Sequence, residues 1–69
     1  MMDKAEVKQV EAYLRGCFSN QDISLILRPQ ANDSVEFEIN GETLGIVYRD
    51  DEDGDVCYHV QLTVLAEDI

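Results

Sequence analysis

The stretch SVEFEINGETLGIVYR, residues 34–49, decides the fold because it joins two strand-like segments through a tight turn. Val35, Phe37 and Ile39 alternate with polar residues, which is the period of a strand with one apolar face. Asn40-Gly41 follows at once, and this pair indicates a two-residue hairpin because a type I′ turn needs positive φ at both central residues. The stretch therefore predicts an antiparallel hairpin.

The same alternation continues on both sides of the hairpin. It predicts four strands, at about 23–28, 34–39, 42–49 and 56–65. With a two-residue turn, Phe37 is opposite Leu44, and pairing Tyr48 with Tyr58 keeps one face apolar across the last three strands. We therefore expect a four-stranded antiparallel meander with both tyrosines on its apolar face.

The segment at about 3–18 is predicted to be a helix. Asp3 is placed to cap it, and Glu6 follows at the spacing of a capping box. Apolar residues then recur with a 3.6-residue period. The predicted fold class is α+β, one N-terminal helix packed on the meander, in a single small acidic domain over 1–69. The predicted core consists of Val7, Val10, Leu14, Phe18, Ile23, Leu25, Leu27, Val35, Phe37, Ile39, Leu44, Ile46, Tyr48, Tyr58, Val60, Leu62 and Val64.

Charge and length exclude several classes of function. The 69 residues include five Lys and Arg against fifteen Asp and Glu, a net charge of −10. Binding to nucleic-acid phosphates or to anionic membranes needs clustered Lys or Arg, so neither is expected. The sequence has no glycine-rich phosphate loop, no membrane-spanning apolar run and no secretory signal core. We expect a cytoplasmic protein in which Cys17 and Cys57 are reduced.

The acidic stretch DDEDGD, residues 50–55, is the most conspicuous motif. Hard cations take oxygen ligands from such clusters. Aligning Gly54 with the glycine of a calcium-binding EF-hand loop places Arg49 at the first ligand position, and arginine cannot ligate. A solvated loop that discourages edge aggregation is favoured. Weak divalent-cation binding is the alternative, and its candidate ligands are Asp50, Asp51, Asp53 and Asp55.

The sheet face away from the helix has no second layer to cover it. Its residues are mostly polar, which is typical of a solvated antiparallel sheet. Self-association through this face is the alternative, since a small domain gains stability from a partner. The candidate interaction residues are Ile26, Glu36, Val47, His59 and Gln61.

A shallow notch is predicted on this outer face, between Glu36 and His59, with Gly45 between them in the expected ladder. A carboxylate and an imidazole are a minimal acid–base pair. No nucleophile or oxyanion donor accompanies them, so we assign no catalytic residue and no cofactor.

Four stretches resemble a known family: residues 27–29, 33–36, 45–47 and 50–55. They are similar to the uncharacterised alphaproteobacterial proteins grouped as domain of unknown function 3126, and the likeness covers nearly the whole chain. The resemblance implies a bacterial cytoplasmic protein and supplies no activity, cofactor or catalytic residue.

Two classes of function remain open from the residues. The leading expectation is a small, acidic, non-enzymatic interaction or adaptor domain, with a basic protein or a second copy of the chain as its partner. The alternative is a weak divalent-cation-binding or minor enzymatic module that uses residues 50–55 or the Glu36/His59 face.

Overall fold

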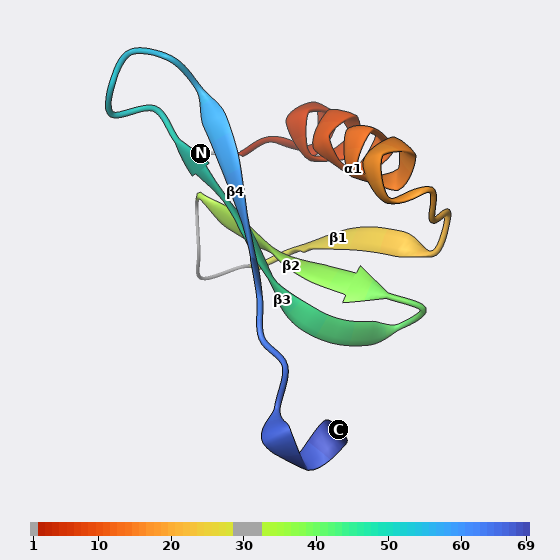
Figure 1. Ribbon diagram of the computed structural model, residues 1–69. Coiled ribbons are helices and arrows are strands. Elements are labelled where there is room, and N and C mark those ends of the chain that lie inside the picture. The colour runs from red at the N-terminus through yellow and green to blue at the C-terminus, as the bar shows by residue number, and fades with distance from the viewer. Residues whose placement is uncertain (1, 29–32) are drawn as a thin grey trace.

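One α-helix, one four-stranded sheet and a short 3₁₀ helix make up the structure, a computed structural model that describes residues 2–28 and 33–69. The elements are α1 (Lys4–Phe18), β1 (Ile23–Leu27), β2 (Ser34–Ile39), β3 (Glu42–Asp50), β4 (Cys57–Leu62) and a short 3₁₀ helix, η1 (Ala66–Asp68). The strands lie in the order β1-β2-β3-β4 and every neighbouring pair is antiparallel (Figure 1). The predicted α+β class, one N-terminal helix on a four-stranded meander, is confirmed.

Helix α1 is defined at both ends by its caps. The Asp3 carboxylate accepts the amide hydrogen of Glu6 at 2.7 Å, which satisfies one of the free donors of the first turn. At the other end Ser19 adopts a left-handed conformation, with φ of 52°, and its amide bonds back to the last turn. Among the described residues, no helix combines the length and the apolar content that crossing a bilayer requires.

The edge of β1 is covered by side chains of α1. Glu11 accepts the amide hydrogen of Leu25 at 2.9 Å, and Arg15 donates to the carbonyl of Ile23 at 2.8 Å. Glu11 and Arg15 also form an ion pair at 3.3 Å, one turn apart on the helix. These two side chains of α1 therefore satisfy backbone groups at the free edge of β1 that would otherwise be available to another strand.

A β-bulge in the β2–β3 pair decides which residues of β3 face the helix. Next to the turn Glu38 pairs with Thr43, but Phe37 pairs with Gly45 and not with Leu44. One extra residue of β3 is inserted there, and because side chains alternate, the later residues of β3 lie on the faces opposite to those predicted. The predicted pairing of Phe37 with Leu44 is therefore wrong.

Gly45 allows β4 to lie close against β3 beside the bulge. A Cβ atom at this position would overlap the backbone carbonyl of Gln61, so only glycine fits without a backbone shift. From there the β3–β4 register is regular, with Tyr48 opposite His59 and Arg49 opposite Tyr58. The predicted pairing of Tyr48 with Tyr58 is wrong, and the two tyrosines lie on opposite faces.

The core lies between α1 and the β1–β2 side of the sheet. Its buried side chains are Met2, Val7, Val10, Leu14, Ile23, Leu25, Val35, Phe37 and Val47. Six residues of the predicted core are exposed instead: Phe18, Leu27, Tyr48, Val60, Leu62 and Val64. The helix packs chiefly over β1, and the strand order places β4 at the opposite edge of the sheet (Figure 1). The apolar inner face of β4 is therefore largely uncovered.

Candidate functional site

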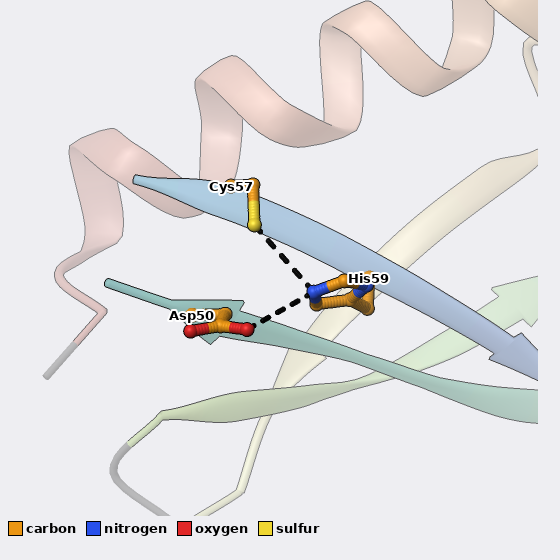
Figure 2. Close-up of side chains that lie close together, drawn as sticks. All are labelled: Asp50, Cys57 and His59. Carbon is orange, nitrogen blue, oxygen red and sulfur yellow. Dashed lines mark hydrogen bonds and ion pairs between the residues drawn. The ribbon is translucent and has the colours of Figure 1, made fainter. Parts of the chain in front are cut away.

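Three side chains with metal-ligating atoms meet on the outer face, where β3 ends and β4 begins (Figure 2). Asp50 is directly opposite Cys57 in the sheet, and His59 lies two residues further along β4 on the same face. His59 Nε2 is 3.2 Å from Asp50 Oδ2 and 3.5 Å from Cys57 Sγ. The register thus gathers a carboxylate, a thiol and an imidazole, which we call the Asp50–Cys57–His59 cluster.

Two neighbouring contacts orient this cluster. The backbone amide of Glu52 donates to Asp50 Oδ1 at 3.1 Å, and the other carboxylate oxygen faces His59. The ring of Tyr48 stacks on the imidazole of His59, with centroids 4.9 Å apart and planes at 26°. The pKa of Asp50 is lowered by the amide hydrogen bond from Glu52 and by the contact with His59, so its charged form is favoured.

Arg49 lies on the opposite, helix-facing side of the sheet. Its Nη1 is 3.1 Å from Asp51 Oδ2, and its Nε is 3.1 Å from Glu6 Oε2, an ion pair without hydrogen-bond geometry. Tyr58 donates its hydroxyl to the same Glu6 carboxylate, and this hydrogen bond together with burial raises the pKa of Tyr58. These contacts connect the first turn of α1 to β3 and β4.

The acidic stretch contributes one carboxylate to the cluster, that of Asp50. Asp51 is paired with Arg49, and Gly54 forms a turn with φ of 88° whose amide bonds to the carbonyl of Asp51 at 3.2 Å. The cation-ligand roles of Asp51, Asp53 and Asp55 stay predictions.

Two of the candidate-site predictions for the outer face are wrong. Val47 is fully buried on the helix-facing side, so its assignment to the interaction face is wrong. The predicted Glu36/His59 notch is also wrong, because Gly45 lies on the inner face opposite Phe37. The bulge causes both errors, since it exchanges the faces of these β3 residues.

The other predicted interaction residues do lie on the outer face. Ile26, Glu36 and Gln61 form one cross-strand row that Ile46 of β3 completes. His59 stands one row away, opposite Tyr48. The interaction role of these residues stays a prediction.

The sequence did not predict an apolar groove that separates α1 from β4. Its volume is about 390 Å³, and its lining residues are Gln9, Val10, Tyr13, Leu14, Tyr58 and Val60. Tyr13 is 71% exposed beside it. The alternation of Tyr58, Val60 and Leu62 is the available signal, but alternation by itself predicts a face that the helix covers. We call this feature the α1–β4 groove.

Comparison with known proteins identifies a family and no activity. No curated protein matches the chain, and no solved structure matches it. A family model described as "Protein of unknown function (DUF3126)" matches residues 6–68, which include nearly all of α1 and all four strands. The resemblance seen in the sequence is therefore confirmed, and the chain belongs to the DUF3126 family of proteins of unknown function.

Proposed function

We propose that this chain is a small, acidic, non-enzymatic interaction domain that binds an extended segment of a basic partner protein along β4. The observation that carries the proposal is that β4 is an edge strand with an exposed apolar face. Val60 is 36% exposed and Leu62 is 49% exposed, although both point toward the helix side of the sheet. Strand addition at such an edge is a recurring mode of peptide recognition.

The backbone of β4 supports this mode of binding. Thr63 donates its amide hydrogen to Leu44 at 2.8 Å, so the opposed pair Thr63–Leu44 is a hydrogen-bonded one. Because such pairs alternate along an antiparallel ladder, Tyr58, Val60 and Leu62 direct their backbone groups away from β3. Residues 57–62 contain no proline and no lysine, the residues that commonly block an edge.

The two edges of the sheet differ in a way that favours β4. At β1, Glu11 and Arg15 of the helix already bond to the backbone of Leu25 and Ile23. At β4, the described part of the chain provides β3 as the only neighbouring strand. A strand added to β4 would project alternate side chains into the α1–β4 groove, whose volume is in the usual range for binding pockets.

Charge favours a basic partner over a second copy of the chain. The five carboxylates of residues 50–55 precede β4, and Glu67 and Asp68 follow it. In an antiparallel pair of two β4 strands, the acidic stretch of one copy would lie near the acidic end of the other. An apolar segment with Lys or Arg at both ends would instead place its positive charges beside these carboxylates. Electrostatic complementarity therefore favours a basic partner.

The two cysteines bear on the cellular compartment in which we propose that binding takes place. Cys17 and Cys57 are both free thiols, which suits a reducing compartment. We therefore propose the alphaproteobacterial cytoplasm that the family resemblance implies.

Peptide binding to the intact chain tests the proposal. One peptide has about eight residues of alternating valine and threonine with two lysines at each end. A second has the same core with glutamates at its ends, and a third keeps the lysines but loses the alternation. We expect the first peptide to shift the NMR amide signals of Tyr58, Val60 and Leu62. The other two should bind about tenfold more weakly or less at low salt.

A pair of matched variants locates the binding edge. Val60→Lys places a charge on the helix-facing side of β4, whereas Leu27→Lys makes the same change on the helix-facing side of β1, the edge that α1 already occupies. Binding should be lost with Val60→Lys and kept with Leu27→Lys, while thermal melts show that both variants fold. Absence of peptide binding, or equal loss in both variants, would overturn the proposal. Dimerisation in sedimentation experiments that Val60→Lys abolishes would make the partner a second copy and refute the basic one.

A further inference from the structure

The Asp50–Cys57–His59 cluster places three different kinds of donor atom on one small patch of the outer face (Figure 2). We infer that this cluster is a three-ligand site for Zn²⁺. The inference does not depend on the interaction proposed for β4, because the cluster lies on the other face of the sheet from the α1–β4 groove.

The distances between the donor atoms agree with tetrahedral zinc coordination. Zinc–sulfur bonds are about 2.3 Å long, and zinc–nitrogen and zinc–oxygen bonds are about 2.0–2.2 Å long. In a tetrahedron with these bond lengths, the sulfur ligand is about 3.5 Å from the nitrogen ligand, and the nitrogen ligand is about 3.3 Å from the oxygen ligand. The corresponding distances here are 3.5 Å, from Cys57 Sγ to His59 Nε2, and 3.2 Å, from His59 Nε2 to Asp50 Oδ2. The carboxylate oxygen and the thiol sulfur are within 4.8 Å of each other, and the Cys57 side chain is exposed.

Regular strands and neighbouring groups hold the donors in place. Asp50 and Cys57 are opposed in the ladder, and His59 follows Cys57 by two residues, so the backbone fixes all three on one face. The Glu52 amide orients the carboxylate, and the stacked Tyr48 ring orients the imidazole. Such outer contacts are what keep metal ligands in a productive orientation.

The donor set and the surrounding charge select the ion. A thiolate with an imidazole suits zinc and not the hard cations calcium and magnesium, which take oxygen ligands. The five carboxylates of residues 50–55 attract cations to this end of the sheet. Arg49, the cationic residue next to Asp50, is turned to the other face and paired with Glu6. Three protein ligands leave a fourth position for water or for a donor from a bound molecule.

Cobalt substitution tests the site with a direct spectroscopic readout. Titrating the chelator-treated chain with Co²⁺ should give the intense visible bands of tetrahedral cobalt and a sulfur-to-cobalt charge-transfer band, at one ion per chain. Zn²⁺ should displace the cobalt and bleach both. In the loaded chain, Cys57 should resist alkylation by iodoacetamide, while Cys17, the other exposed cysteine, reacts as in the free chain.

Matched variants distinguish this site from non-specific binding to the acidic stretch. Zn²⁺ binding should weaken by about 100-fold in each of the variants Cys57→Ser, His59→Gln and Asp50→Asn. This is the upper end of the loss that follows removal of an outer-shell partner, and here a direct ligand is removed. Cys17→Ser and Asp53→Asn are the controls and should leave the affinity within about twofold, because neither residue belongs to the cluster.

Three results would overturn the inference. They are a cobalt spectrum without the thiolate band, zinc affinity that Cys57→Ser leaves unchanged, and an equal loss of affinity in Asp53→Asn. None of these results bears on peptide binding at β4, so the two proposals fail separately.

Discussion

Replacing Val47 by alanine is the sharpest test of the bulged register. Val47 is completely buried in the central part of the sheet, and the substitution removes two methyl groups. The transfer term is roughly 0.8 kcal/mol for each buried methyl or methylene group, and the remaining cavity adds to it. We expect the free energy of unfolding to fall by about 2–3 kcal/mol. For a domain of this size, that corresponds to a decrease in melting temperature of about 8–24 °C.

The matched control is the same substitution at Val60, the direct cross-strand neighbour of Val47. Val60 is 36% exposed, so Val60→Ala leaves no comparable cavity and should cost less than about 1 kcal/mol. Urea unfolding followed by circular dichroism measures both variants, and an unchanged denaturant slope shows that the unfolded states are comparable.

The registers with and without the bulge predict opposite answers to which of the two variants loses more stability. In the register without a bulge, Val60 faces the core and Val47 faces solvent. In the structure Val47 is the buried partner. A larger loss of stability in Val60→Ala than in Val47→Ala would therefore refute the bulge and every placement on the outer face that depends on it.

Two further predictions concern backbone packing and pH. Gly45→Ala should lower the free energy of unfolding in urea by about 1–3 kcal/mol, because the added Cβ meets the carbonyl of Gln61. The control is Gly16→Ala in α1, which should be neutral or slightly stabilising because there is open space around this position. Equal changes in the free energy of unfolding in the two variants would refute this prediction. Because the folded state raises the pKa of Tyr58, the stabilisation from its neutral phenol is complete below the ordinary tyrosine pKa and is lost as pH rises through the raised value. Tyr58→Phe should reduce this alkaline decrease in the melting temperature; an identical decrease in the variant would show that other groups cause all of it.

The elements of the fold follow from short-range features of the sequence. The Asp3 cap lies just before α1, and the period-two segments correspond to the four strands. The turn at Asn40-Gly41 has positive φ at both residues, 55° and 83°. Each of these features depends on local conformational preference or on periodicity within one element, so the sequence was sufficient to find it.

The candidate site could be predicted only in part. The sequence indicates both Asp50 and His59 as candidates, but in the register without a bulge Asp50 falls on the helix-facing side and is opposite Val56. The bulge turns Asp50 to the outer face and sets it opposite Cys57. A single inserted residue has this effect because side chains alternate with a period of two, and only packing across strands decides whether it is inserted.

The open inner face of β4 also required the tertiary structure. An α-helix is about 10 Å wide, whereas four strands at about 4.8 Å spacing span a wider sheet, so one helix cannot cover every strand. The sequence determined the helix, the strands, the hairpin and the family. Where the helix lies across the sheet, and which side chains of β3 face it, are settled by contacts between distant residues, and these contacts leave β4 open and bring Asp50, Cys57 and His59 together.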